Sequence, residues 1–244
     1  MGLELFVRRG RSLVPTEEGR LLVSYAERLL RLADEAESAL RTGKLLGTLR
    51  IGSLESTAGS RLPELLSRYN QANPAVRIEL VTGTTGALIS RLARHDIEAA
   101  FVSEPFHAPG VAAEPVFEET LVLITGSHIN SLSSLASMGN FALIAFASGC
   151  SYRRLLEQWQ SENEVSVSGV LEFSSYPAIV ACVAAGTGVA IVPKSVLAGL
   201  RAAQMVRAHE LPAHMASNRT HLIWHEGKES LALKSMRQLL ISAE

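Results

Sequence analysis

The chain has 244 residues, of which 47% are apolar, and its 23 basic and 24 acidic side chains leave a formal net charge of −1. This composition excludes a disordered protein and is sufficient for the core of one large domain or two modest ones. It also excludes a global electrostatic field that would hold a nucleic acid or an anionic membrane, so any such binding must be local.

Residues 1–14, MGLELFVRRGRSLV, predict a strand, an Arg-Gly-Arg turn and a second strand. The turn carries the one basic cluster of the chain, Arg8, Arg9 and Arg11. These arginines are either solvated turn residues or contacts to phosphate groups. A hairpin with arginines at its tip that leads into a long helix has the shape of a wing lying along a DNA backbone. We therefore predict that the three arginines contact DNA.

A single long helix is predicted from Pro15 to Gly43. Thr16 can accept a hydrogen bond from the first turn, two glutamates follow it, and a glycine ends the segment. The apolar side chains recur at alternating spacings of three and four residues, which is typical of a narrow seam between two helices; they are Leu22, Tyr25, Leu29, Leu32, Ala36 and Ala39. We expect a dimerising linker helix; the alternative is an ordinary long core helix.

After Gly47 the pattern changes to alternating strands and helices, which indicates a parallel sheet with right-handed crossovers. The first set is predicted as strands at 48–54, 76–82 and 97–103 and helices at 61–71 and 87–94. A long strand at 116–125 then leaves this sheet for a second one. The second set is predicted as strands at 141–146, 169–173, 189–192 and 206–211 and helices at 152–162 and 177–185.

The last two predicted elements are a strand at 220–225 that crosses back to the first sheet and a closing helix at 229–241. The fold class is therefore α/β, with two lobes preceded by a long dimerisation helix. The predicted domains are a wing at 1–15, a linker helix at 16–46 and a two-lobed domain at 47–244. Its first lobe comprises 47–124 and 221–244, and its second lobe comprises 125–220.

The predicted junctions between the elements of both lobes are rich in hydroxyl groups. In open α/β sheets ligands bind at the carboxyl ends of strands, against helix N-termini. Hydroxyl groups and free backbone amides together suit a carboxylate or another small anion. At any single junction the simpler explanation is a helix cap. The candidates that we take from these junctions are Ser56, Thr57, Thr85, Ser103, Gly149, Cys150, Ser151, Thr187 and Gly188.

Three charged residues near these junctions have alternative roles. Arg153, one turn into its helix, either adds positive charge to the cleft or is an exposed helical arginine. Glu55 and Glu104 indicate a ligand that carries an amine, although carboxylates at helix starts are also favoured by the helix dipole.

The sequence holds no recognisable catalytic or metal-binding motif. Gly186-Thr187-Gly188 lacks the third glycine and the helix of a dinucleotide fingerprint. His221 and His225 lie on a predicted strand without an accompanying carboxylate ligand, which favours a structural role over a metal site. Cys150 leaves a redox role open as a minor hypothesis, and Cys182 is predicted in the core. We expect no enzyme activity, no cofactor and no metal.

The cysteines are far apart, without CxxC spacing, which fits a reducing cytoplasm. No apolar run approaches the ~20 residues that span a bilayer, and the N-terminus lacks an apolar signal core. We therefore expect a cytoplasmic protein without a membrane partner.

Three segments together resemble LysR-type bacterial transcriptional regulators. ELFVRRGRSLVPTEEGRLLVSYAERLL resembles their wing and linker helix, and GTLRIGSLESTAGSRLPELLSRYNQANPAVRIELVTG resembles the opening of their effector-binding domain. VAAGTGVAIVPKSVL resembles the segment that closes the second lobe of that domain. The resemblance covers essentially the whole chain.

The resemblance implies a homo-oligomeric regulator with two periplasmic-binding-protein-like lobes around a small-molecule effector. It implies DNA as the partner of the full-length form and a homodimer, with a homotetramer left open. From this resemblance together with the hydroxyl-rich junctions and the two glutamates, we expect a small carboxylate or an amino-acid-like metabolite as effector. By similarity, the effector contacts the set Ser56, Thr57, Ser103, Cys150, Ser151, Thr187 and Gly188.

One departure from the family concerns the N-terminus. The family's helix-turn-helix is expected before Leu3, and this sequence does not contain it. We therefore expect a truncated form or a shortened gene product, which would lack sequence-specific base readout. The rival hypotheses are a transport solute receptor of the same two-lobed architecture and a small enzyme on a doubly wound sheet. The first requires a secretory signal, and the second requires a positioned nucleophile or base.

Overall fold

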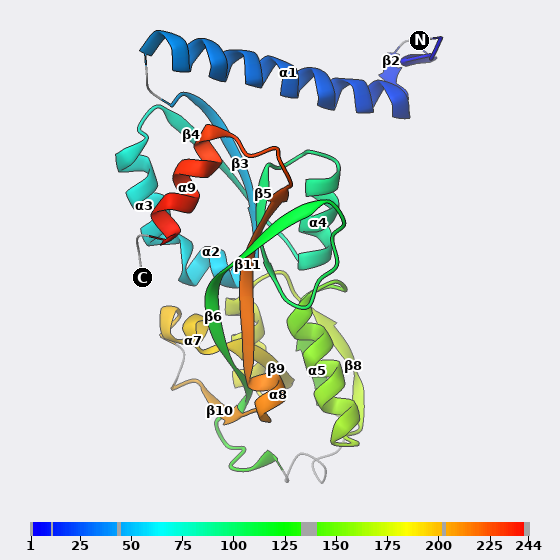
Figure 1. Ribbon diagram of the computed structural model, residues 1–244. Coiled ribbons are helices and arrows are strands. Elements are labelled where there is room, and N and C mark those ends of the chain that lie inside the picture. Colours follow the sequence, from blue (N-terminus) through cyan, green and yellow to red (C-terminus); the bar gives the residue numbers. More distant parts are fainter. Residues whose placement is uncertain (1, 11, 43–44, 133–140, 202–203, 242–244) are drawn as a thin grey trace.

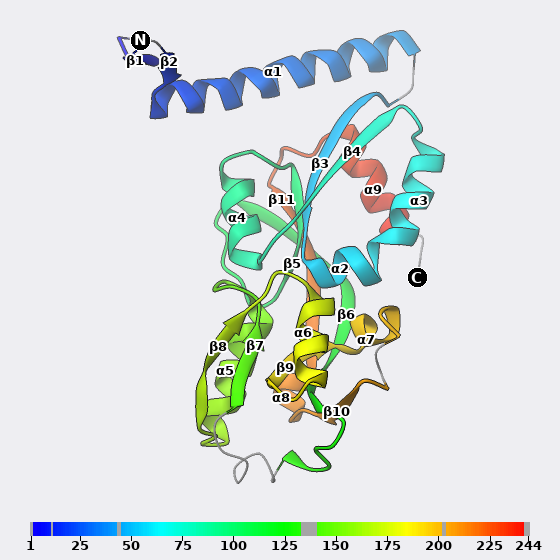
Figure 2. The ribbon, with the colours of Figure 1, turned by 180° about the vertical axis from the view of Figure 1, so that it is seen from behind.

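The computed structural model describes residues 2–10, 12–42, 45–132, 141–201 and 204–241, and within the first helix the side chains of residues 17–26, 29–30 and 33. Figure 1 shows two α/β lobes one above the other, with helix α1 lying across the far end of the first lobe. Figure 2 shows the opposite side, where the first lobe still separates α1 from the second lobe.

The N-terminal hairpin and the long helix are confirmed. Strands β1 (Phe6–Arg9) and β2 (Ser12–Pro15) pair antiparallel. Helix α1 spans Glu17–Thr42, and Thr16 Oγ1 accepts a hydrogen bond from the backbone N–H of Gly19 at 2.9 Å, as expected of an N-cap. A Cβ atom at Gly19 would lie 1.9 Å from the carbonyl oxygen of Leu5, so the hairpin packs against the helix only with glycine there.

The described apolar side chains of α1 are exposed in the single chain. Leu22, Tyr25 and Leu29 are 46%, 47% and 68% exposed, so α1 is not a core helix. The side chains of Leu32, Ala36 and Ala39, which complete the predicted seam, lie outside the described residues.

The first lobe contains the parallel strands β3 (Gly47–Ser53), β4 (Val76–Thr82) and β5 (Ala99–Ser103). Its helices are α2 (Glu55–Ser60), α3 (Leu62–Ala72), α4 (Thr85–Ala93) and α9 (Leu231–Ile241). The sequence predicted one helix where α2 and α3 now stand. The Ser-Thr-Ala-Gly-Ser run resembles a loop, but it forms a short helix, and the proline at the start of α3 separates the two.

Two antiparallel strands, β6 (Val111–Gly126) and β11 (Ser217–His225), connect the lobes. Strand β6 begins five residues before its predicted start and includes Pro115, a residue type that strands accept mainly at edges and bulges. The strand accommodates this proline beside a register shift opposite Thr220 and His221. The second half of β6 pairs with β9 and β10 of the second lobe.

The second lobe contains β7 (Phe141–Ala145), β8 (Val167–Glu172), β9 (Gly188–Pro193) and β10 (Val206–Glu210). Its helices are α5 (Ser151–Glu162), α6 (Tyr176–Ala184) and the short α7 (Lys194–Gly199) and α8 (Ala213–Ala216), of which the last two were not predicted. Each lobe has its own apolar core, and the side chains from Leu121 to Ile124 pack in the second. The lobe boundaries given above remain a prediction.

Candidate functional site

A small cavity lies where the two lobes meet. Its volume is about 20 Å³, which is the scale of a single water molecule. Residues of both lobes line it: Leu54, Glu55, Ser56, Gly83, Thr84 and Ser103 from the first, and Phe146, Cys150, Ser151, Tyr152 and Tyr176 from the second. The carboxyl ends of β3, β5 and β7 meet here, as expected for a ligand site in open α/β sheets.

Most of the predicted site residues converge on this cavity. Ser56, Ser103, Cys150 and Ser151 line it directly. Thr85 Oγ1 accepts a hydrogen bond from the backbone N–H of Ser103 at 3.2 Å and lies 3.4 Å from Ser151 Oγ. The chain therefore brings hydroxyl groups from four separate junctions into one place.

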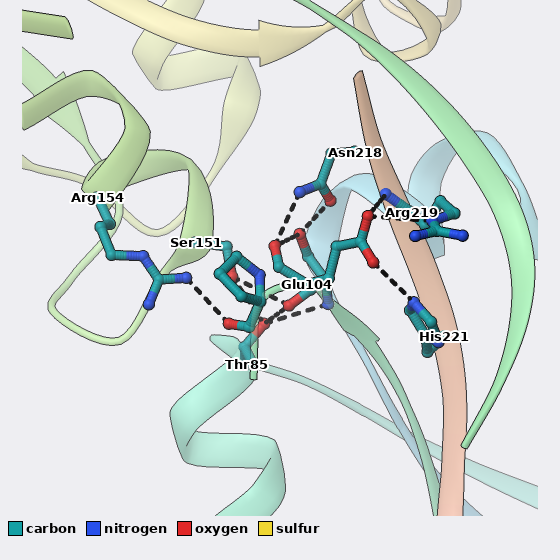
Figure 3. A network of polar contacts seen from close by, with 9 residues as sticks. Thr85, Glu104, Ser151, Arg154, Asn218, Arg219 and His221 are labelled. Atoms are coloured by element: carbon teal, nitrogen blue, oxygen red, sulfur yellow. Dashed lines mark hydrogen bonds and ion pairs between the residues drawn. The ribbon is translucent and has the colours of Figure 1, made fainter. Parts of the chain in front are cut away.

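The lobes are in direct contact around the cavity. The backbone N–H of Gly86 donates to the carbonyl oxygen of Gly149 at 3.3 Å, which places the predicted residue Gly149 at the rim. Ser151 Oγ donates to the carbonyl oxygen of Ser103 at 3.1 Å, and Arg154 Nη2 donates to that of Pro105 at 2.9 Å (Figure 3). The cleft is thus closed.

Three predicted residues lie elsewhere. Thr57 is 1% exposed in α2 and does not line the cavity. Thr187 and Gly188 lie at the start of β9, beside Ala142 at the start of β7. Because β7 and β9 are parallel and the cavity lies at their carboxyl ends, these two residues are at the opposite end of the lobe. Thr187 and Gly188 lie where helix α6 ends and strand β9 begins, whereas ligand sites in such sheets lie where a strand ends and a helix begins.

Aromatic residues at the cavity were missed by sequence reasoning. Tyr152 is 5% exposed, and its hydroxyl has no hydrogen-bond partner among the described residues. The ring of Tyr176 lies 4.9 Å from that of Phe146. Burial raises the pKa of both tyrosines, so both hydroxyl groups are neutral donors at pH 7. Each tyrosine directly follows a serine at the start of a helix, and this pattern could have predicted their position at the cavity.

Burial also governs two other ionisable groups at the cavity. It raises the pKa of Glu55, and the backbone N–H of Tyr176 offsets this only in part. It raises the pKa of the Cys150 thiol as well, despite nearby backbone N–H groups and arginines. A buried thiol with a raised pKa is a poor nucleophile, which argues against the redox hypothesis.

A second contact also holds the lobes together. Arg61 Nε, between α2 and α3, lies 2.7 Å from Glu119 Oε1 on β6. Ser195 Oγ on α7 donates to Glu119 Oε2 at 2.7 Å. Because Glu119 is only 3% exposed, this carboxylate depends on both partners for its hydrogen bonds.

Glu104 is held by side chains of its own chain (Figure 3). It accepts hydrogen bonds from Arg219 Nε and His221 Nε2, both at 3.1 Å, and Asn218 Nδ2 donates to its backbone carbonyl at 2.8 Å. These partners, rather than an amine-bearing ligand, balance its charge. Arg153 is likewise paired with glutamates on the surface and does not line the cavity.

The Glu104 network predicts a specific loss of stability in acid. Burial alone would raise the pKa of Glu104, but the hydrogen bonds from His221 and Arg219 outweigh it and lower this pKa below its usual value. The stabilisation is therefore present above about pH 4.5, and it is lost as pH falls through the lowered pKa. In urea titrations, Glu104→Gln should cost stability at pH 7 and progressively less in acid. An equal cost at pH 7 and pH 3 would contradict this assignment.

Other sequence-based candidates have structural roles. His225 Nε2 donates to the carbonyl oxygen of Leu92 at 2.8 Å, and His221 bonds Glu104. Within the described ranges, no group of three or more His, Cys, Asp or Glu residues is arranged to hold a metal ion. No helix in the part of the chain that the structure describes has the length and apolar character needed to cross a membrane.

Comparison with known proteins identifies the family. The profile of the LysR substrate binding domain matches residues 42–243. The chain is 35% identical over 209 residues to the HTH-type transcriptional regulator GltR of Bacillus subtilis (strain 168), covering 85% of this chain and 71% of GltR.

Solved structures of similar fold include a full-length OxyR variant from Pseudomonas aeruginosa, with a TM-score of 0.69 at 19% identity, covering 99% of this chain and 80% of that one. The regulatory domain of CcmR from Synechocystis, in complex with 2-PG, has a TM-score of 0.69 at 20% identity and covers 81% of this chain and 97% of that one. The fold is thus that of LysR-type effector-binding domains. The chain belongs to the LysR family of transcriptional regulators, of which it contains the effector-sensing domain.

Proposed function

We propose that this regulator binds its effector in the cleft between the lobes, and that the effector is a small carboxylate or an amino-acid-like metabolite. The observation that carries the proposal is the cavity that residues of both lobes line together. A molecule bound there contacts both lobes at once, so its binding free energy changes how they close.

The chemistry of the lining supports a small anionic group. Helices α4, α5 and α6 begin at the cavity, and the positive ends of their dipoles favour negative charge. Ser56 adds a hydroxyl group that can donate a hydrogen bond, whereas the hydroxyls of Ser103 and Ser151 already donate within the chain. The CcmR domain of the same fold was solved with 2-PG, which agrees with a small ligand in such a domain.

A contact between the lobe and α1 supports transmission toward DNA. Helix α4 begins at the cleft with Thr85, and beyond its other end lies His95. The ring of His95 lies 6.1 Å from that of Tyr25 on α1 and 4.3 Å from that of His225 on β11. A shift of α4 at the cleft therefore reaches the helix that carries the arginine hairpin.

The outputs of this movement are DNA binding and oligomerisation. Arg8 and Arg9 are exposed at the hairpin and suit contacts to phosphate groups, whereas Arg11 lies outside the described residues. The exposed apolar face of α1 suits a second copy of the chain, which gives a homodimer and leaves a homotetramer as a further assembly of dimers. A cytoplasmic location fits this role.

A wedge between the lobes tests the proposal. Gly86 is exposed on α4 and faces Gly149, and a Cβ atom there would lie 3.6 Å from Gly149 Cα. Gly86→Trp should therefore prevent closure without disturbing either core. In a thermal-shift and calorimetric screen of small carboxylates, amino acids and polyamines, the best ligand should bind roughly 10-fold or more weakly to this variant.

The matched control is Gly59→Trp. Gly59 is an exposed helical glycine of the same lobe, and a Cβ atom there would meet nothing within 4 Å. Its tryptophan should leave ligand affinity unchanged. Equal affinities of the two variants for the same ligand would place the binding site outside the cleft.

A further inference from the structure

Two residues of the cleft carry polar groups that the chain itself satisfies incompletely. The hydroxyl of Tyr152 is buried without a hydrogen-bond partner among the described residues, and a buried unsatisfied donor costs about 1–3 kcal/mol. Glu55 is partly buried, and burial disfavours its charged form. Both side chains line the same cavity. Groups that break local packing rules in this way are typical of binding sites.

The two groups come from opposite lobes. Tyr152 lies on α5 of the second lobe. The polar groups near its hydroxyl include the carboxylate of Glu119, which is paired with Arg61, and the hydroxyl groups of Ser103 and Ser56. Glu55 lies at the start of α2 in the first lobe and accepts a hydrogen bond from the backbone N–H of Tyr176 in the second. Tyr176 also lines the cavity, next to both Tyr152 and Glu55.

The chemistry of each group defines its ligand partner. The neutral hydroxyl of Tyr152 has no acceptor within hydrogen-bond distance among the described residues. The carboxylate oxygen of a ligand would be a strong acceptor for it. The carboxylate of Glu55 is partly buried and has no positively charged partner among the described residues that line the cavity. An ammonium group of a ligand would give it both an opposite charge and hydrogen-bond donors.

We propose that Tyr152 and Glu55 make the cleft selective for a zwitterion of the α-amino-acid type, with Tyr152 donating to the ligand carboxylate and Glu55 pairing with its ammonium group. This inference rests on the proposed function and narrows its ligand class. Ligands that lack either charge leave one of the two groups unsatisfied, and such mismatches carry large penalties in buried sites.

The test compares the L-amino acids with the corresponding 2-hydroxy acids, which keep the carboxylate and replace the ammonium by a neutral hydroxyl. Calorimetry on the wild-type chain should find an amino acid that binds roughly 10- to 100-fold more tightly than its 2-hydroxy acid. In Glu55→Gln this ratio should fall to about threefold or less. In Tyr152→Phe affinity for the amino acid should fall roughly 10- to 100-fold.

A stability measurement distinguishes this role from a structural one. Tyr152→Phe removes an unsatisfied group, so the melting temperature of the ligand-free protein should stay the same or rise. The matched control is Tyr69→Phe, because Tyr69 Oη donates to the carbonyl oxygen of Ala232 at 3.0 Å in the first core. That control should lower the melting temperature and leave ligand affinity unchanged.

The outcomes separate this inference from the proposed function. A lower melting temperature of ligand-free Tyr152→Phe, equal affinities for amino and hydroxy acids, or no binding by any amino acid would each overturn the zwitterion assignment. If another ligand class binds and Gly86→Trp weakens it, the cleft remains the effector site. Binding that Gly86→Trp leaves unchanged overturns both.

Discussion

Replacing Arg61 by methionine is expected to lower the free energy of unfolding by about 3 kcal/mol, because it leaves a buried carboxylate without its counter-ion. Glu119 is 3% exposed, and Arg61 Nε lies 2.7 Å from it. Methionine keeps most of the apolar stem of arginine, so lost packing contributes little. For a domain of this size the melting temperature should fall by about 6–12 °C.

Urea denaturation at pH 7 measures this loss, and two further variants locate its origin. The double variant Arg61→Met with Glu119→Gln should recover part of the lost stability, since the buried charge is then removed. Arg77→Met is the matched control, because Arg77 is 77% exposed and lies 3.7 Å from Glu79. It should change stability by no more than about 0.5 kcal/mol. A similar loss in Arg61→Met and Arg77→Met would contradict the prediction.

Leu29→Glu is expected to dissociate dimers of this chain, with a dissociation constant raised by about 100-fold or more. Leu29 is 68% exposed in the single chain and belongs to the predicted seam of α1. In a symmetric dimer the substitution removes two buried leucines and introduces two carboxylates at the interface, and each leucine contributes about 1.5–3 kcal/mol. Sedimentation at micromolar concentration measures the change.

Leu30→Glu is the matched control for this prediction. Leu30 is 67% exposed, but it lies beside the seam rather than on it. A new charge at this position should therefore affect dimerisation much less. If both variants dissociate equally, the interface covers a broad face of α1 rather than the heptad seam.

Periodicity and strand-end rules made most of the fold predictable. The strand Val76–Thr82 was placed at its observed limits, because alternation and turn residues on both sides define it locally. Strand β6 was predicted to begin too late. It includes Pro115, which fits there beside a register shift with β11, and such a shift is a tertiary feature that the sequence does not show. The helix that begins at Glu55 was missed, because its hydroxyl residues have low intrinsic helix propensity.

The candidate site was predictable where it depends on topology and unpredictable where it depends on packing. Ser103 and Ser151 were found because parallel strands end at one edge of a sheet. Glu119 was not found from the sequence, because its partner Arg61 lies 58 positions away in the chain. The orphan hydroxyl of Tyr152 was also invisible, since a missing partner is a property of the folded neighbourhood alone.

The closed cleft raises the effector concentration that this regulator needs for a response. An effector larger than the cavity of about 20 Å³ enters only when contacts such as Arg154 to Pro105 and Gly86 to Gly149 are broken. At about 1 kcal/mol each, two or three such bonds weaken the apparent affinity by roughly 30- to 150-fold. Substitutions at the rim that never touch the effector therefore retune the concentration threshold of the sensor while its selectivity stays the same.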